Sequence, residues 1–337
     1  MSAIAGLATR QVFFLGVNTG YVRNGLPDAR FLNFYARRSS SNLHCAIVGN
    51  VVVPGGHASN EATPLLNSDA IWSEIASAIA SGGSCPGIQL ATVWEGYIGS
   101  RKFVNASSDV VLEGRRMVLA MKRDGISSML DAFEAAVNLA LSHGFAHIQL
   151  HAAHGYLLSL LIDARINPDA DFVLHRLAVI GTLLRREGIE SSIRISLRNG
   201  DIAFDTDGMA AFQQDICRLP FDFIDLSSGY YNIDKRLIYP ARPSVLAQRL
   251  EDSVDAALRH PECQFIVSGR ALHYNWTELP KNIHPGICRD LIANPNVLDE
   301  PANGCQNHNK CHYYSRGEPH LTCARWVPGT SELKKVP

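Results

Sequence analysis

Short apolar segments alternate with longer amphipathic segments along almost the whole chain. The apolar segments are rich in β-branched and aromatic residues and are apolar nearly throughout, which is typical of strands that are buried on both faces. They predict eight strands, at residues 11–17, 44–53, 87–92, 147–152, 192–197, 222–228, 264–269 and 285–289.

The amphipathic segments carry apolar residues at spacings of three and four, which predicts helices. One of them is "SSMLDAFEAAVNLALSHG", in which Ser127 or Ser128 is a suitable N-cap and Gly144 is expected to end the helix. The predicted helices cover residues 28–40, 69–81, 127–143, 172–187, 207–217 and 244–259.

Strands that alternate with helices in this way predict a parallel sheet covered by helices. Two architectures fit, a doubly wound open sheet and a closed eight-stranded parallel β/α (TIM) barrel. The segment "GVNTGYVRNG" after the first strand lacks the G-x-G-x-x-G spacing of a dinucleotide fold, and the count of eight strands favours the barrel. We expect the barrel to span residues 1–300, with a short Cys-containing C-terminal extension, residues 301–337, packed on it.

In such a barrel the active site lies at the C-terminal ends of the strands. Arg194 lies inside the apolar strand "SIRISL" and requires an acceptor, because an unpaired buried charge is costly. Hydrogen-bond donors are numerous at the strand ends, and only the two histidines offer proton chemistry, which predicts a pocket for a flat, phosphate-bearing ligand. The polar residues in these strands or at their ends are Asn18, Thr19, Asn50, Gln89, His151, His154, Arg194, Ser227, Ser228, Ser268 and Arg289.

Composition narrows the class of protein. The chain has 337 residues, of which 46% are hydrophobic, and a formal net charge of -1, so no overall field favours nucleic acid or anionic membrane. Eight cysteines are too few for a disulfide framework. No stretch of 18 apolar residues occurs, and no charged leader precedes an apolar core, so we expect a cytoplasmic protein with reduced thiols.

The segment "FAHIQLHAAHGYLL" resembles the Old Yellow Enzyme family of flavin-dependent oxidoreductases, nearest the barrel domain of the 2,4-dienoyl-CoA reductase branch. Members of that family carry a strand ending in His-x-x-His or His-x-x-Asn, followed by Gly-Tyr-Leu. The segments "GNVVV", "GIQLA", "IRIS", "DFIDLSSG", "IVSGRAL" and "CRDLIANP" resemble further family blocks in the family's order. The similarity runs from about residue 11 to 323.

The resemblance implies an FMN-binding TIM barrel that reduces an activated C=C bond, with NADH or NADPH as electron donor. His151 and His154 would bind the electron-withdrawing oxygen of the substrate, and Tyr156 would protonate the carbon alpha to that group. A small-molecule substrate is the expected partner, without nucleic acid or membrane, and a homo-oligomer is left open. The implied cofactor-binding residues are Asn18, Thr19, Asn50, Gln89, Arg194, Ser268, Gly269, Arg270, Cys288 and Arg289.

Departures from the family pattern leave alternatives open. The chain after "HGYLLSLL" differs from the family, Thr92 stands where His is common, and the segment from Gly269 to Cys288 is short. A flavin-dependent dehydrogenation or isomerisation in a natural-product pathway therefore remains an alternative, as does a flavin-free scaffold. The two histidines could also be structural, and Arg194 could be the partner of a buried Asp.

The C-terminal segment contains Cys305, His308, Cys311 and Cys323 at the spacing C-x2-H-x2-C-x11-C. Family members that bind a four-iron four-sulfur cluster carry four cysteines at similar spacing, and one imidazole can replace a thiolate at an iron–sulfur or zinc site. We favour a metal-free loop, because no FAD- or NADPH-binding domain follows in this sequence. Iron–sulfur and zinc sites stay open as alternatives.

Overall fold

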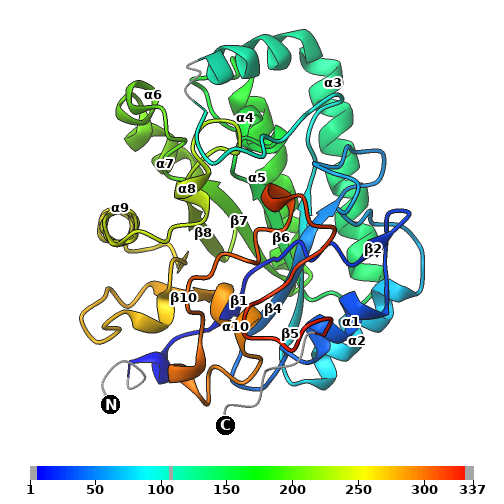
Figure 1. Ribbon diagram of the computed structural model, residues 1–337. Coiled ribbons are helices and arrows are strands. Elements are labelled where there is room, and N and C mark those ends of the chain that lie inside the picture. The colour runs from blue at the N-terminus through cyan, green and yellow to red at the C-terminus, as the bar shows by residue number, and fades with distance from the viewer. Residues whose placement is uncertain (1–5, 106–108, 331–337) are drawn as a thin grey trace.

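The chain forms a closed barrel of eight parallel strands surrounded by helices (Figure 1). The computed structural model describes residues 6–105 and 109–330. Around the barrel the strands follow the order β1-β10-β9-β8-β7-β6-β5-β4, and β1 closes it by pairing with both β10 and β4. The strands are β1 Phe13–Phe14, β4 Cys45–Val52, β5 Cys85–Ala91, β6 His147–Ala152, β7 Glu190–Ser196, β8 Phe223–Ser227, β9 Phe265–Val267 and β10 Ile283–Ile287.

This topology confirms the predicted barrel and excludes the doubly wound open sheet. All eight predicted strands are present, with ends within a few residues of those expected. A short antiparallel pair, β2 Val22–Arg23 and β3 Leu26–Pro27, lies outside the barrel. These two strands were not predicted, because two residues carry no readable periodicity.

Helices lie around the barrel, and all six predicted helices are present. Their neighbours include several single-turn helices that follow strands at the C-terminal end of the barrel. The α-helices are α1 Ala29–Ala36, α2 Ile71–Ser81, α3 Asp109–Ser142, α4 Leu157–Leu161, α5 Ala170–Arg186, α6 Ile202–Thr206, α7 Met209–Cys217, α8 Lys235–Ile238, α9 Pro243–Arg259 and α10 Arg289–Ala293.

Helix α3 is much longer than predicted. It starts at Asp109, so neither Ser127 nor Ser128 is an N-cap, and Ser128 Oγ instead donates to the carbonyl of Asp124 at 3.0 Å inside the helix. The helix is interrupted at Lys122, whose φ of 55° and ψ of 175° are not helical. Its predicted end is correct, since Gly144 follows the last turn with a φ of 86°, a conformation that glycine adopts readily.

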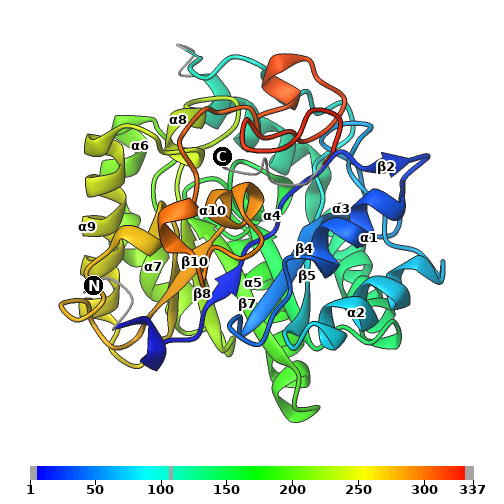
Figure 2. The ribbon, with the colours of Figure 1, turned by 60° about the horizontal axis from the view of Figure 1, so that its bottom comes forward.

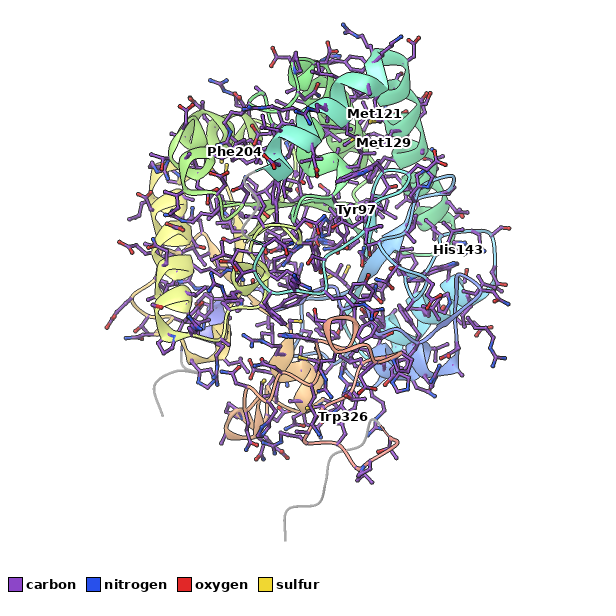
Figure 3. The ribbon with its side chains drawn as sticks, turned by 45° about the horizontal axis from the view of Figure 1, so that its top comes forward. Tyr97, Met121, Met129, His143, Phe204 and Trp326 are labelled. Carbon is purple, nitrogen blue, oxygen red and sulfur yellow. The ribbon has the colours of Figure 1, made fainter. Side chains whose placement is uncertain are left out.

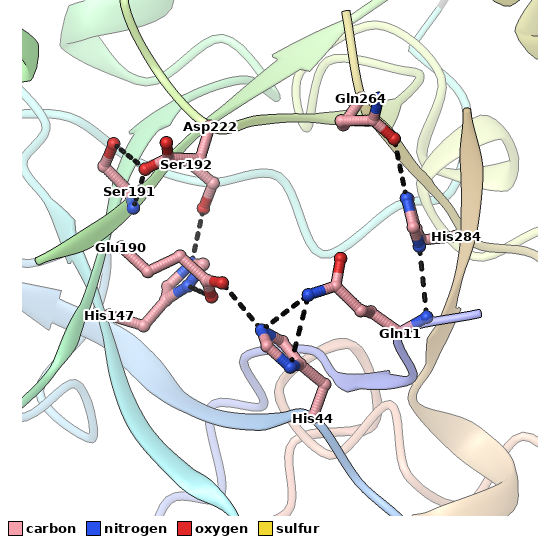
Figure 4. Close-up of polar contacts among 9 residues, drawn as sticks. All are labelled: Gln11, His44, His147, Glu190, Ser191, Ser192, Asp222, Gln264 and His284. Carbon is pink, nitrogen blue, oxygen red and sulfur yellow. Dashed lines mark hydrogen bonds and ion pairs between the residues drawn. The ribbon is translucent and has the colours of Figure 1, made fainter. Parts of the chain in front are cut away.

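Polar groups and aromatic rings close the N-terminal end of the barrel (Figure 4). Glu190 accepts from His44 Nε2 at 2.7 Å and lies 2.5 Å from His147 Nδ1. Burial raises the pKa of Glu190, but the hydrogen bonds of His147 and His44 outweigh burial and lower the pKa to about 2. Phe13 and Phe223 pack edge to face above this network with ring centroids 5.0 Å apart. The barrel interior is therefore filled by side chains at this end.

The chain after α10 folds back over the C-terminal end of the barrel (Figure 2). Leu321 N donates to the carbonyl of Thr19 at 2.8 Å, and Tyr21 donates its hydroxyl to the carbonyl of Leu321 at 3.1 Å. Trp326 is buried and its indole N–H donates to the carbonyl of Ile292 at 3.0 Å. The described part of the predicted extension, residues 301–330, thus packs on the barrel.

The connection between β9 and β10 contains one 3₁₀ turn, Ala271–His273, in agreement with the short segment noted in the sequence.

All eight cysteines lie within the described residues, and none of them forms a disulfide. None of the helices in the described ranges combines the length and the hydropathy needed to cross a bilayer.

Candidate active site

A cavity opens at the C-terminal ends of the strands. His151, His154 and Tyr156 all line it. The structure therefore brings the expected catalytic residues together with nearly all of the expected cofactor-binding residues. The latter, in the same cavity wall, are Asn18, Asn50, Gln89, Arg194, Ser268, Gly269, Arg270, Cys288 and Arg289.

Thr19 is the exception among the expected cofactor-binding residues, because it is fully buried outside the cavity wall. Its hydroxyl accepts from Tyr21 N at 3.2 Å, and its carbonyl holds Leu321 of the returning C-terminal segment. Successive side chains of an extended chain point to opposite sides, so Asn18 reaches the cavity and Thr19 does not. Thr19 anchors the C-terminal segment instead.

His151 and His154 lie together at the end of β6, with ring centroids 5.1 Å apart and planes inclined by 67°. His151 is the penultimate residue of β6. His154 comes two residues after the end of the strand and has a positive φ of 65°. Ala153 N donates to His151 Nδ1 at 3.4 Å, which places the ring proton of His151 on Nε2. The tight turn, which Gly155 continues with a φ of 77°, turns both rings into the same cavity.

Ser227 determines the tautomer of His154. Its Oγ lies 3.2 Å from Arg194 Nη2 and 3.3 Å from Arg249 Nη2, and guanidinium groups only donate. The serine proton therefore points to His154 Nε2, 2.7 Å away. His154 thus accepts at Nε2 and carries its own proton on Nδ1.

Both imidazoles are neutral. Burial, and then the charge of Arg194, lowers the pKa of His151 to about 3. Burial and the same charge lower the pKa of His154 well below its usual range. At neutral pH each ring therefore has one N–H donor and no charge.

Tyr156 lies between His151 and Tyr231 in a stack of rings. Its centroid is 4.8 Å from that of His151 and 5.6 Å from that of Tyr231, with interplanar angles of 24° and 21°. Burial, and then the neighbouring Tyr231, raises the pKa of Tyr156 well above its usual range, while hydrogen bonds with Ser59 and Asn50 act in the opposite direction. The phenol therefore stays protonated and can act only as a proton donor at physiological pH.

A buried chain of polar side chains crosses the barrel below the histidines. Gln89 donates to Gln149 Oε1 at 2.5 Å, and Gln149 donates to Asp225 Oδ2 at 3.2 Å. Asp225 is fully buried and forms an ion pair with Arg194. Arg194 thus has the buried acidic partner that the sequence allowed as an alternative, and it lines the cavity at the same time.

Arg249 is a cavity residue that sequence reasoning missed. It projects from α9, and its side chain donates to Ser268 Oγ at 3.2 Å and to the carbonyl of Leu237 at 2.8 Å. Its Nε is buried without a partner among the described residues. Burial, and then the charge of Arg194, lowers its pKa to about 10. Arg249 lies four residues before the buried Ser253 on the inner face of α9.

Two further arginines line the cavity near β9 and β10. Arg289 donates to Asn307 Oδ1 at 3.0 Å and to the carbonyl of Pro240. Arg270 contacts His273 Nε2 at 2.8 Å, and its Nε is buried without a partner within the described ranges. Gly269 has a φ of 110°, and a Cβ there would approach Arg249 Cδ to 3.1 Å, so the backbone comes close to the cavity where a side chain would not fit.

Aromatic side chains form the upper wall of the cavity. Tyr97, which Figure 3 shows near the middle of the view, packs edge to face on Tyr156 with centroids 6.0 Å apart. Tyr231 and Tyr239 share a hydrogen bond of 2.7 Å between their hydroxyls. The cavity is thus cationic at one end and aromatic at the other.

The structure does not gather the four C-terminal residues considered as metal ligands. Cys305 and Cys311 line the cavity, whereas His308 is exposed and lies 3.3 Å from Gln306 Oε1. Across residues 6–105 and 109–330 no group of three or more His, Cys, Asp or Glu side chains is positioned to hold a metal ion. Cys323 is outside the cavity wall.

Comparison with known proteins finds relatives that are NADH-dependent flavin oxidoreductases. No family model matches the chain. The NADH-dependent flavin oxidoreductase nadA of Aspergillus parasiticus is 24% identical over 257 residues, which cover 67% of this chain and 56% of that protein. The corresponding enzyme iccE of Talaromyces variabilis is 25% identical over 263 residues, 65% of this chain and 62% of that protein. A third, iliE of Hypocrea jecorina, is 22% identical over 312 residues, 79% of this chain and 74% of that protein.

Two solved structures share the fold. The barrel superimposes on 2-naphthoyl-CoA reductase in complex with 2-naphthoyl-CoA with a TM-score of 0.70 and 13% identity, covering 93% of this chain and 54% of that chain. It superimposes on Old Yellow Enzyme from Pichia sp. AKU4542 with a TM-score of 0.61 and 14% identity, covering 86% and 82%. The chain resembles the Old Yellow Enzyme family. The resemblance seen in the sequence is thereby confirmed, with the chain spanning little more than half the length of nadA.

Proposed function

We propose that this protein is an FMN-dependent oxidoreductase that reduces an activated carbon–carbon double bond, with NADH or NADPH as electron donor. The observation that carries the proposal is the meeting of His151, His154 and Tyr156 with buried arginines in one cavity. NADH is the favoured donor, since the names of all three curated relatives specify it.

The cavity has the donor set that FMN requires. Arg249 and Arg270 each keep a buried Nε without a partner among the described residues, and an anionic phosphate would satisfy such groups. Gln89 on β5 and Arg194 on β7 line the same cavity, where an amide and a cation suit the polar edge of a flavin ring. We therefore assign FMN to this cavity, with its phosphate toward Arg249, Arg270 and Ser268.

The chain's own residues supply the remaining chemistry. Bound FMN would supply the hydride. His151 and His154, as neutral donors, would hold the carbonyl or similar oxygen of the substrate and stabilise the negative charge that develops there. Because both imidazoles are neutral, they act by donation and do not transfer a proton themselves.

Tyr156 would complete the addition by protonating the carbon alpha to that oxygen. Its stack against His151, with centroids 4.8 Å apart, keeps the phenol beside the oxygen-binding pair. Its raised pKa means that the proton is retained until the substrate takes it.

Turnover tests this function directly. The protein, saturated with FMN, is reduced by NADH under anaerobic conditions and then mixed with cyclic enones, an α,β-unsaturated ester or a nitroalkene. We expect rapid reoxidation by at least one of these compounds and a product saturated at the former double bond. A flavin that NADH reduces but that no activated alkene reoxidises would contradict ene reduction and favour a dehydrogenation or isomerisation.

A further inference from the structure

The C-terminal segment places a second histidine site in the cavity, at His312. This residue lies between the 3₁₀ turn Pro301–Asn303 and the turn Tyr314–Arg316, in the stretch that folds over the barrel end. It lines the same cavity as His151 and His154. The sequence of this stretch suggested only a metal site at Cys305, His308, Cys311 and Cys323, and no role for His312.

Neither ring nitrogen of His312 has a partner among the described residues. Its side chain is nevertheless about nine-tenths buried, with 9% of the residue exposed. A buried polar atom that makes no hydrogen bond destabilises a fold, so such atoms normally have a hydrogen-bond partner. Because His312 lines the cavity, a ligand group is the candidate partner.

Aromatic rings hold the imidazole of His312 in place. Tyr239 lies against one side with a centroid distance of 4.3 Å, and Phe103 lies at 5.6 Å. The ring is neutral, because burial, and then the charges of Arg289 and Lys235, lowers its pKa to about 4. A neutral imidazole offers one donor and one acceptor, which suits a hydroxyl or a carbonyl more than an anion.

A continuous row of rings connects His312 with the proposed catalytic pair. The rings in contact along this row are 4.3, 6.3, 5.6 and 4.8 Å apart at their centroids. His312 is thus separated from His151 by three tyrosine rings, and the wall between them is aromatic, with the planes of Tyr231 and Tyr239 inclined by 65°. The row runs from His312 through Tyr239, Tyr231 and Tyr156 to His151.

We propose that His312 hydrogen-bonds a second oxygen of the substrate, a hydroxyl or carbonyl on a flat ring system whose reacting carbonyl lies at His151 and His154. The inference rests on the proposed function and adds a substrate class to it, namely planar aromatic or quinone-like ketones oxygenated at both ends. His312 is a specificity-determining residue in this account. It takes no part in hydride or proton transfer.

Binding of matched ketones tests the inference. The pairs are 4-hydroxyacetophenone with acetophenone, and 6-hydroxy-2-acetylnaphthalene with 2-acetylnaphthalene, titrated into the FMN-saturated protein by isothermal titration calorimetry. We expect the hydroxylated member of at least one pair to bind about tenfold more tightly, the effect of one well-placed hydrogen bond. His312→Phe keeps the ring but removes both nitrogens, so it should abolish this ratio and leave the affinity for the parent ketone unchanged.

Two further variants complete the experiment. His312→Gln retains a donor and an acceptor and should keep part of the ratio. His320→Phe is the matched control, because His320 lies on the same segment, packs on Tyr21 and is outside the cavity wall. It should keep the full ratio.

The outcomes separate this inference from the proposed function. A ratio near one in the unmodified protein, or an equal ratio in His312→Phe, overturns the role of His312. If His312→Phe no longer binds the parent ketone either, the ratio of the two ketone affinities in His312→Gln is compared with the ratio in the unmodified protein instead. A protein that binds no FMN contradicts the proposed function instead, and the heats of ketone binding without flavin then still decide the role of His312.

Discussion

Arg194 and Asp225 face each other across β7 and β8 and form an ion pair inside the barrel. Asp225 has no exposed surface, and 11% of the Arg194 side chain is exposed, toward the cavity. The carboxylate therefore holds a guanidinium at the cavity floor, and the charge of that guanidinium adds to the effect of burial, which keeps His151 and His154 neutral. One ion pair thus links the stability of the barrel to the protonation of the site.

Removal of the acidic partner should destabilise the fold. Asp225→Asn leaves Arg194 as a buried cation without its counter-ion, and breaking a buried pair in this way costs about 3–5 kcal/mol. We expect urea denaturation to show a loss of this size in the free energy of unfolding. The double variant Asp225→Asn with Arg194→Gln should regain part of it, and a double variant as unstable as the single one would contradict the coupling.

Tyr156→Phe should slow alkene reduction by about 10²–10⁴-fold, the usual contribution of a positioned acid. The rate of flavin reduction by NADH should not change, because no proton from Tyr156 enters that step. Stopped-flow absorbance separates the two half-reactions. Tyr97→Phe is the control, since Tyr97 packs on Tyr156 in the same wall; a large loss in that variant and none in Tyr156→Phe would move the acid role to Tyr97.

Arg249→Gln should weaken FMN binding by about ten- to hundredfold, as expected for loss of a charge-assisted hydrogen bond. Fluorescence quenching of free FMN measures the dissociation constant without any turnover. Arg259→Gln is the control on the same helix, because Arg259 is partly exposed and forms an ion pair with the exposed Asp255, one turn earlier in the helix. Equal affinities in the two variants would mean that Arg249 does not contact the cofactor.

Stability should fall as the pH decreases below about 6.5, in part through His151. The pKa of His151 is about 3 in the folded protein and 6.5 when the chain is unfolded. Between these values only the unfolded state takes up the proton, so the contribution is fully present above pH 6.5 and is lost as the pH falls toward 3, by about 1.4 kcal/mol per pH unit.

The measurement is the free energy of unfolding at pH 5 and pH 6, with His151→Asn for comparison. Glu190 does not interfere there, because its pKa of about 2 makes its own contribution disappear only as the pH falls below its unfolded value of 4.5. We expect a shallower pH dependence in His151→Asn. Identical slopes would show that His151 is not held neutral by the fold.

The barrel could be predicted from the sequence because its strands are buried on both faces and are therefore apolar without interruption. β6 was predicted at its observed ends, residues 147–152. Short elements such as α4 and α8 were missed, since one helical turn has no readable period. The first half of α3 was missed as well, because "EGRRMVLAMKRDG" carries charges on most of its surface.

The site was predictable where its residues belong to strand ends or to family blocks. Thr19 was assigned wrongly to the cavity wall, because alternation along an extended chain, not closeness in sequence, decides which side chain reaches the cavity. Arg249 and His312 were missed because each comes from a segment far in sequence from the strands it faces. Their presence in the cavity depends on how α9 and the C-terminal segment pack, which local sequence patterns do not record.

The central claim is that this cavity binds FMN, and an equilibrium titration tests it most directly. Purified protein is titrated into FMN, and the visible spectrum and flavin fluorescence are followed. The account predicts a yellow complex with one FMN per chain, a shifted and sharpened flavin absorbance, and weaker binding in Arg249→Gln. A protein that remains colourless after dialysis and leaves the spectrum of added FMN unchanged would contradict it.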